Sequence, residues 1–458
     1  MLTANLAAKL QSVLGANRVT AEEHSLLAFA VDGISPAAVI QPASAEEVAE
    51  VVRFAASENL AIVSCGSRSK LELGMPPARY DIALDMSGLC RIAHYDPSDL
   101  TLSIDAGMPL RQLEQALAEK QQFLPLAVPC FETSTVGGAV ASGIDSVLRQ
   151  QYGTARDFLI GAEFVDGTGK ICKSGGRVVK NVTGYDLYKL LIGSLGTLCV
   201  ITRLNFRTFP LAQVSGGQLT SFAGVEDALA FRRGLEAAGL PLSNLEVLSP
   251  GIAAILAAIL RSAKSGVPQG LEQGRWCVYA SYEGNAAVVE RISRELEKLA
   301  HQTNATECEP LEKSTDESLG GMLREAFEWL RFASPAVLLL RLTLPEFSAE
   351  ASAGLSDILK ANSLRGAFLL RARGVVYFLA QDDSEGAALD RLGKTASDIV
   401  RMVAEKRGHA SLLHAPLALK SRASIWAGTD ETFGLMRRVK QAFDPQGLFA
   451  PGRFPGGL

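Results

Sequence analysis

The sequence lacks the features of a metal centre, a disulfide framework or a nucleic-acid-binding surface. Its seven cysteines include no C-x-x-C pair and are widely scattered, at positions 65, 90, 130, 172, 199, 277 and 308. An odd, dispersed set is typical of reduced thiols in a cytoplasmic protein, so we expect no disulfides and no iron–sulfur or zinc site. The formal net charge of -4 provides no basic footprint, so we expect no nucleic-acid partner.

Long apolar runs are also missing. The longest, IAAILAAIL at 252–260, is about half of what a membrane span requires. The opening residues, MLTANLAAKLQSVLG, are amphipathic and lack the basic start and long apolar core of a signal peptide. We therefore expect no transmembrane segment and a cytoplasmic protein; the family resemblance given below adds the expectation of a peripheral position at the inner membrane, through partners.

What is present is the length and composition of a packed protein with more than one domain. A chain of 458 residues is too long for one compact core, and 48% apolar with 21% charged residues is ordinary for a globular fold. Early in the chain, Ser44 and Glu47 form a capping-box pattern before a helical stripe. Asp166-Gly167 marks a hairpin, and residues 108 to about 125 predict a helix.

Beyond Pro210 the pattern changes to strand-like segments separated by amphipathic helices. Two successive sets of strand, helix and strand predict a mixed α+β domain, with helices on one face of an antiparallel sheet. The segment RSAKSGVPQGLEQG, residues 261–274, predicts a mobile surface loop.

Three segments rich in glycine and small residues lie in the first part of the chain. GSRSK at 66–70 follows a buried strand, and its backbone N–H groups suit a phosphate nest or, more simply, a tight turn. TVGGAVASG at 135–143 leaves room for a flat ligand or for close helix packing. The third is 175–202, GGRVVKNVTGYDLYKLLIGSLGTLCVIT, in which Lys180 and Asn181 suit hydrogen bonds within the loop. A large cofactor needs several backbone approaches, so three such segments favour a cofactor site.

These segments are part of a longer series with a recognisable order. It runs VIQPASAEEVAEVVRFA, GSRSK, TLSIDAGMPLRQLEQAL, TVGGAVASG, QYGTARDFLIGAEFVDGTGK, VVKNVTGYDLYKLLIGSLGTLCVIT and FDPQGLFAPGRF. The series resembles the FAD-binding family named after vanillyl-alcohol oxidase and p-cresol methylhydroxylase (PCMH). VVKNVTGYDL…GSLGTL is most similar to the FAD-binding accessory subunits of bacterial glycolate oxidases. The resemblance implies an α+β fold with a two-subdomain PCMH-type FAD-binding domain at 1–210, an α+β, ferredoxin-like cap at 211–430, and a C-terminal segment at 431–458 that returns to the FAD domain.

The resemblance also implies which residues contact FAD. Ser67 and Arg68 depart from the family's glycine-richer pyrophosphate loop, although Arg68 could add a charge-assisted contact to phosphate. The residues carried over are Gly66, Ser67, Arg68, Ser69 and Lys70 for the pyrophosphate; Pro129, Thr135, Gly137 and Gly138 for the ribityl chain and flavin ring; Gly143, Tyr152 and Gly153 for the continuation of that segment; and Gly193, Gly196, Thr197, Val200 and Ile201 for the adenine end.

The same resemblance bears on how FAD is held. Covalent flavin in this family is attached to a histidine of the glycine loop, or to a cysteine or histidine elsewhere in the domain. No histidine lies between positions 24 and 94, so the loop has none. Cys65 and Cys130 remain formal candidates, but such a thiol is more often a small buried filler. We therefore expect non-covalent FAD.

Residues for substrate oxidation are not recognisable, and we assign no catalytic residue and no metal ligand. Catalytic relatives often have a His-rich metal motif, where this chain reads RGHASLLHAP with His409 and His414 five residues apart. They also tend to have Glu in GSEGT, where this chain has Leu195. The interpretation is an FAD-binding subunit of a glycolate oxidase or similar 2-hydroxy-acid dehydrogenase complex, passing electrons to a partner; its partners would be a catalytic flavoprotein subunit and an iron–sulfur subunit.

Two alternatives stay open. One is a self-sufficient FAD-dependent 2-hydroxy-acid oxidase or dehydrogenase, which needs an arginine for the substrate anion and a base near the flavin. Its candidate arginines in the cap are Arg331, Arg341, Arg371 and Arg373. The other is a scaffold that keeps the fold for assembly only, which the intact glycine segments disfavour.

Overall fold

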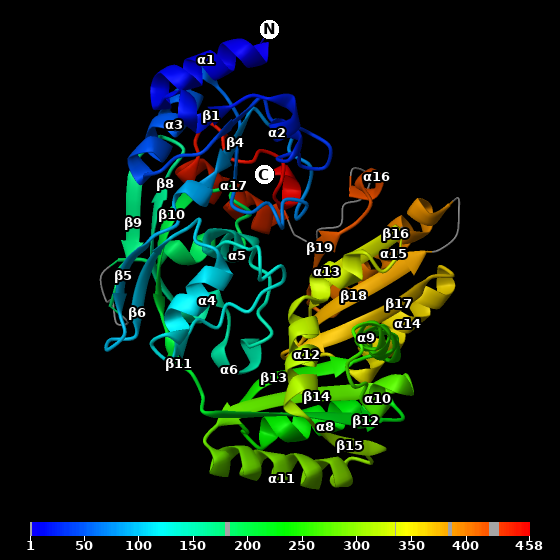
Figure 1. The fold of residues 1–458 in the computed structure, drawn as a ribbon. Coiled ribbons are helices and arrows are strands. Elements are labelled where there is room, and N and C mark those ends of the chain that lie inside the picture. The colour runs from blue at the N-terminus through cyan, green and yellow to red at the C-terminus, as the bar shows by residue number, and fades with distance from the viewer. Residues whose placement is uncertain (1, 179–183, 335, 383–386, 421–429) are drawn as a thin grey trace. The chain divides into compact units, whose positions relative to one another are not determined.

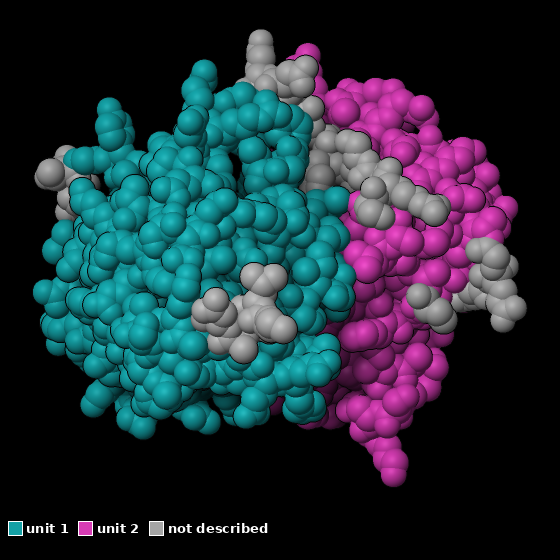
Figure 2. All heavy atoms as spheres, turned by 90° about the horizontal axis from the view of Figure 1, so that it is seen from above, with its two compact units in different colours: residues 1–145, 154–211, 428–458 teal, residues 146–153, 212–427 magenta. Residues whose placement is uncertain are grey.

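The computed structural model describes residues 2–178, 184–334, 336–382, 387–420 and 430–458 (Figure 1). The chain divides into two compact units, coloured separately in Figure 2. Unit 1 comprises residues 1–145, 154–211 and 428–458, and unit 2 comprises 146–153 and 212–427. Residues 146–153, which we expected in the first domain, thus group with unit 2.

The first sheet of unit 1 has the strand order β1-β2-β4-β3, with β2, β4 and β3 parallel. Its strands are β1 (Val19–Thr20), β2 (Ala38–Ile40), β3 (Ile62–Cys65) and β4 (Ile82–Asp85). Helix α3 (Ala45–Glu58) packs on it through the predicted apolar stripe. Ser44 caps this helix because its Oγ accepts the N–H of Glu47. The Glu47 carboxylate accepts the N–H of Ala43 rather than that of Ser44, so the capping box is shifted by one residue.

The second sheet of unit 1 is antiparallel, in the order β5-β6-β10-β8-β9. Its strands are β5 (Ile92–Asp96), β6 (Thr101–Asp105), β8 (Leu159–Val165), β9 (Ile171–Gly175) and β10 (Val200–Arg207). The hairpin predicted at Asp166 joins β8 and β9. The Oδ1 of Asp166 accepts hydrogen bonds from the N–H groups of Thr168 and Lys170. Helices α4 (Leu110–Ala118) and α5 (Val136–Ser142) contribute to the core of this sheet.

The helix expected up to about Pro125 was predicted too long. It ends at Ala118, because β7 (Gln122–Phe123) pairs with β11 (Phe209–Pro210). The remaining short elements of unit 1 are α1 (Leu2–Leu14), η1 (Ala16–Arg18), α2 (Glu23–Leu27), η2 (Met86–Gly88), α7 (Ala155–Phe158), η3 (Leu187–Leu191), α17 (Asp430–Phe443) and η4 (Pro455–Gly457). After α17 the chain runs beside β3, with a parallel bridge between Ile62 and Phe449.

Unit 2 is built on one antiparallel sheet of eight strands, in the order β15-β12-β14-β13-β17-β18-β16-β19. Its two halves each have the β-α-β-β-α-β arrangement of a ferredoxin-like module, and they meet where β13 pairs with β17. The strands are β12 (Val214–Phe222), β13 (Leu242–Leu248), β14 (Trp276–Gly284), β15 (Glu307–Leu311), β16 (Ala336–Thr343), β17 (Arg365–Arg371), β18 (Val375–Asp382) and β19 (His409–His414).

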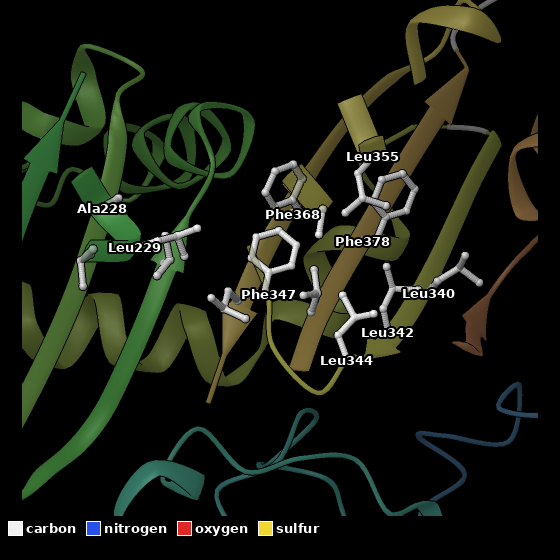
Figure 3. Close-up of a cluster of buried hydrophobic side chains, with 14 of the residues drawn as sticks. Ala228, Leu229, Leu340, Leu342, Leu344, Phe347, Leu355, Phe368 and Phe378 are labelled. Atoms are coloured by element: carbon white, nitrogen blue, oxygen red, sulfur yellow. The ribbon is translucent and has the colours of Figure 1, made fainter. Parts of the chain in front are cut away.

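Helices cover both faces of this sheet, whereas the sequence predicted one covered face. The four long module helices enclose the main hydrophobic cluster with residues such as Leu340, Phe368 and Phe378 (Figure 3). They are α8 (Val225–Ala237), α11 (Ala286–Gln302), α14 (Ala349–Ala361) and α15 (Ala388–Glu405). Tyr279 alternates with cluster residues along β14, and its hydroxyl donates to Asp316 of α12, so α12 lies on the other face.

Other elements complete unit 2: α6 (Arg149–Tyr152), α9 (Pro250–Ser262), α10 (Gln269–Glu272), α12 (Lys313–Arg324), α13 (Ala326–Arg331) and α16 (Leu417–Lys420). The predicted loop 261–274 contains the helix α10 and buries Leu271 completely, so it is not a simple surface loop. The expected fold class, a mixed α+β protein with a two-domain organisation, is confirmed.

Candidate FAD-binding site

A cavity in unit 1 forms where four stretches of chain meet. They are the end of β3 with the loop after it, the beginning of α5, the Leu195–Gly196 turn and the C-terminal tail. The cavity contains about 570 Å³ of empty space, including solvent at its mouth. The residues carried over from the family that line it are Gly66, Ser67, Arg68, Ser69, Lys70, Thr135, Gly138 and Gly196.

The loop after β3 presents two cations and several small polar groups. Arg68 has a left-handed backbone, with φ 68°, a conformation that favours glycine. Its guanidinium carbon lies 4.4 Å from the centre of the Phe29 ring, and the residue is exposed rather than directed into the core. The ammonium of Lys70 donates to Ser134, whose hydroxyl donates to the carbonyl of Pro129 at 3.2 Å.

Three glycines at the cavity are required by close approach. A Cβ at Gly66 would lie 2.1 Å from the hydroxyl of Thr135, and Thr135 caps α5 by accepting the N–H of Gly138. A Cβ at Gly138 would meet only that hydroxyl, at 3.0 Å. Gly196 has φ 71°, and a Cβ there would lie 2.9 Å from Ser64 on β3. These glycines therefore leave room for the side chains of Thr135 and Ser64 where the loop, the helix and the turn meet.

Other glycines of the same motifs pack the protein against itself. Gly143 has φ 61°, and its Cβ would lie 2.7 Å from the Cα of Gly193. The N–H of Gly193 donates to Val140 at the end of α5. Gly137 faces Ala106, whose carbonyl accepts its N–H at 2.7 Å. These three glycines hold α5 in place and do not line the cavity.

The remaining predicted contacts are not part of the cavity lining. Thr197 is buried, and Val200 and Ile201 are core residues of β10. Tyr152 and Gly153 belong to unit 2, where the Tyr152 hydroxyl donates to Glu283 at 2.5 Å. Burial, and then Glu283, raise the pKa of Tyr152. Lys180 and Asn181 lie outside the described residues. Contact of these residues with FAD stays a prediction.

The charge of the cavity is one-sided. Its lining includes Arg68, Lys70 and Arg453 and contains no Asp or Glu among the described residues. A wall with three cations, serine and threonine hydroxyls and backbone N–H groups suits an anion. The carboxylate-free lining therefore fits a phosphorylated ligand.

Arg453 is the residue that the sequence did not identify. Only 3% of it is exposed, and its Nη2 donates to the carbonyls of Leu71 and Leu73 at 2.6 and 2.7 Å. Its Nε and Nη1 have no hydrogen-bond partner among the described residues. Burial lowers the pKa of Arg453, and the negative charge of Asp32 opposes this effect. The available signal is the APGR of the C-terminal motif, in which the resemblance implies no role for a single residue.

The thiols near the cavity are poor attachment points for flavin. Cys65 lines it but is buried, and burial followed by the charge of Asp85 raises the pKa of its thiol far above the ordinary value. The Cys130 thiol donates to the carbonyl of Ser69 at 3.7 Å. Since the thiolate is the reactive form, the raised pKa of Cys65 disfavours flavin attachment there.

The cap arginines proposed for a substrate anion are largely engaged. Arg371 is 2% exposed and pairs with Glu246, Nε to Oε1, at 2.8 Å. Arg331 pairs with Glu328 at 2.7 Å, and Arg373 lies 3.7 Å from Glu236. Arg341 lies on β16, and His409 and His414 begin and end β19. Within the described part of the chain, no group of three or more His, Cys, Asp or Glu side chains is placed to hold a metal.

Comparisons with known proteins identify both units. A family model described as an FAD binding domain matches residues 36–175, and one described as the C-terminal domain of FAD linked oxidases matches residues 217–454. The Escherichia coli glycolate oxidase subunit GlcE is 38% identical over 167 residues, which are 36% of this chain and 47% of that protein. The alignment thus spans about half of that relative. The Bacillus subtilis glycolate oxidase subunit GlcD is 23% identical, over 99% of this chain and 97% of that protein.

Solved structures share the fold. That of p-cresol methylhydroxylase with substrate bound has a TM-score of 0.78 at 17% identity, covering 99% of this chain and 97% of that one. An alkyldihydroxyacetonephosphate synthase structure has a TM-score of 0.72 at 16% identity, over 97% of this chain and 86% of that one. Among the described residues, none of the helices is long and apolar enough to cross a membrane.

Proposed function

Because the chain belongs to the family of FAD-linked oxidases, we propose that it is the FAD-binding subunit of a complex that oxidises glycolate or a similar 2-hydroxy acid. The observation that carries the cofactor assignment is the cavity lined by three cations and no carboxylate among the described residues. The relatives support the class of substrate, since they include glycolate oxidase subunits and a D-lactate dehydrogenase of Archaeoglobus fulgidus that is 32% identical over 42% of this chain.

The residues of the cavity would hold FAD by its charged middle. The backbone of Gly66 to Ser69 and the side chains of Lys70 and Arg453 would face the diphosphate, and Gly138 and Gly196 would leave room beside it. FAD, when bound, supplies the capacity to accept a hydride from carbon and to release electrons in one or two steps. The protein's own contribution is to bind and orient the cofactor and to exclude water from it.

A partner is proposed because this chain offers little for the other steps. Oxidation of a hydroxy acid needs a cation for the carboxylate and a base for the hydroxyl proton. Arg371 already pairs with Glu246 and donates to the carbonyl of Leu323, so it is not available to a substrate. The dispersed cysteines supply no ligand set for an iron–sulfur cluster. A catalytic flavoprotein subunit and an iron–sulfur subunit would provide these functions.

The alternative is a self-sufficient 2-hydroxy-acid dehydrogenase. It is favoured by the similarity to the D-lactate dehydrogenase, which is named as an enzyme in its own right. The two proposals differ in whether the isolated chain reduces its own flavin with a hydroxy acid.

The test is an anaerobic titration of the purified flavoprotein with glycolate and with D-lactate, following the flavin absorbance band. We expect no bleaching on the timescale of enzyme turnover, which is roughly tens per second. Bleaching should follow only when a catalytic flavoprotein subunit and an iron–sulfur subunit are added. Rapid bleaching of the isolated chain would select the self-sufficient enzyme, and a purified chain that binds no flavin would contradict both proposals.

A further inference from the structure

The C-terminal tail is built into the wall of the cavity. Beyond α17 it runs beside β3, where Leu448 and Ala450 exchange backbone hydrogen bonds of 2.8 Å with Ile62. Further along, the carbonyl of Arg453 accepts the N–H of Met75 at 3.0 Å. The tail thus joins the first sheet of unit 1 and then crosses the end of the loop that follows β3.

A second set of contacts anchors this tail at its beginning. Lys440 of α17 donates to the carbonyl of Thr197, to the Asp444 carboxylate and to the carbonyl of Phe449, at 2.6, 2.6 and 2.8 Å. The Asp444 carboxylate also accepts the N–H groups of Leu448 and Phe449. The anchor fixes the course of residues 444–449, and with it the position of Arg453.

The side chain of Arg453 is only half satisfied by these contacts. Nη2 donates hydrogen bonds to the carbonyls of Leu71 and Leu73, while Nε and Nη1 have no hydrogen-bond partner among the described residues. A buried cation with unused donors is costly unless an anion pairs with it. Arg453 is one of the residues that line the carboxylate-free cavity, so its charge lies next to an anion bound there.

We propose that Arg453 is the counter-charge for the diphosphate of FAD, and that cofactor binding is thereby coupled to docking of the tail, residues 444–454. The inference rests on the FAD-binding role proposed above. FAD would stabilise the docked tail by completing the hydrogen bonding of Arg453, and the docked tail would in turn tighten FAD. Such coupling is reciprocal by thermodynamic necessity.

The variants separate charge from structure. Arg453→Gln keeps an amide donor for the carbonyls of Leu71 and Leu73 but removes the charge, and Arg453→Lys keeps the charge. Arg79→Met is the matched control, because Arg79 is an exposed arginine outside the cavity that donates to the carbonyl of Asn59 at 3.1 Å. Each full-length protein is stripped of flavin, and dissociation constants for FAD and for ADP are measured by equilibrium dialysis.

We expect Arg453→Gln to raise the dissociation constants for FAD and for ADP by the same factor, about 10- to 100-fold. This factor corresponds to the loss of a charge-assisted hydrogen bond. Arg453→Lys should recover part of this loss, and Arg79→Met should stay within about twofold of the wild type. Hydrogen exchange provides a second readout: ADP should slow exchange of backbone amides at 444–454 in the wild type but not in Arg453→Gln.

The outcomes separate this inference from the proposed function. Wild-type protein that binds FAD, together with an Arg453→Gln variant that binds it equally well, would overturn the role of Arg453 and leave the FAD-binding subunit intact. Wild-type protein that binds neither FAD nor ADP would remove the basis of both. If Arg453→Gln folds poorly, the dissociation constants of Arg453→Lys and the hydrogen-exchange experiment on the wild type test the proposal instead. An absence of tail protection by ADP in the wild type would overturn the coupling.

Discussion

Glu246 of β13 and Arg371 of β17 stand directly opposite each other where the two halves of the cap sheet meet, 2.8 Å apart between Oε1 and Nε. Both side chains are buried, and Arg371 also donates to the carbonyl of Leu323 in α12. Only three residue pairs join β13 to β17, so this ion pair occupies much of the contact between the two strands. Arg371, one of the four cap arginines considered for the substrate anion, is therefore part of the contact between the two halves of the sheet.

Removal of one partner from this pair should be costly. Glu246→Leu leaves a buried, uncompensated guanidinium and should lower the free energy of unfolding by about 3–5 kcal/mol. Trp276 and Trp329 lie in unit 2, so urea unfolding followed by tryptophan fluorescence reports on this unit. The double variant Glu246→Leu/Arg371→Met should lose less free energy of unfolding than Glu246→Leu. An equal or larger loss would show that the unpaired guanidinium is not the cause of the destabilisation.

Substitution of the glycines at the cavity should lower the amount of flavin bound to the protein. Gly138→Val directs its side chain past Thr135 towards the cavity, and Gly196→Val adds a side chain next to Ser64 at a left-handed backbone. Overpacking of this kind costs about 1–3 kcal/mol, which leaves the protein folded but depletes FAD. The ratio of flavin absorbance to protein checks the result. Gly434→Val is the control, because Gly434 in α17 has no neighbour within 4 Å, and this variant should keep its flavin. A full complement of flavin in all three variants would show that Gly138 and Gly196 serve packing alone.

Acid precipitation should release all of the flavin into the supernatant. The expectation of non-covalent FAD is supported by the high pKa of the buried Cys65 thiol, which burial raises. Flavin that remained in the pellet would indicate a covalent bond, and Cys65→Ala and Cys130→Ala would then identify the attachment site.

Asp316 gives unit 2 a defined pH dependence. Burial raises the pKa of its carboxyl above the ordinary value of 3.8, although the Tyr279 hydroxyl, 2.7 Å away, opposes the shift. The folded protein therefore holds this proton more tightly than the unfolded chain. The resulting stability is complete below about pH 4 and is lost as the pH rises through the folded-state pKa.

Asp316→Asn keeps an acceptor for Tyr279 and has no charge to bury. We expect the variant to be more stable than the wild type at pH 7, with the difference shrinking as the pH approaches 4. Urea unfolding at several pH values measures it. A difference that is the same at every pH would show that packing, and not ionisation, is responsible.

Local features of the sequence predicted local structure well. The cap at Ser44 and the turn at Asp166 depend on residues a few positions apart, so both could be recognised from the chain alone. Features that depend on distant partners could not. The helix ending at Ala118 is shortened because Gln122 and Phe123 pair with residues near 210. The second covered face of the cap sheet likewise depends on α12 meeting Tyr279, 37 positions away.

The same distinction applies to the candidate site. The loop at 66–70 and the glycines at 138 and 196 carry their own signal, because backbone approach demands small residues wherever it occurs. The APGR motif marks the position of Arg453 but not its role, because its side chain is held by the carbonyls of Leu71 and Leu73, about 380 positions earlier. An arginine near a Pro-Gly turn is ordinary in sequence, and only the fold makes it part of the cavity.

The order of the chain has a consequence for biosynthesis. Unit 1 begins before unit 2 and is completed after it, by residues 428–458. As a ribosome makes the protein, both sheets of unit 1 and the whole cap sheet emerge before Arg453 does. A nascent chain, or one that terminates early, lacks the last cation of the cavity. Tight binding of the cofactor would therefore follow synthesis of residues 444–454, in keeping with the weaker binding expected of Arg453→Gln.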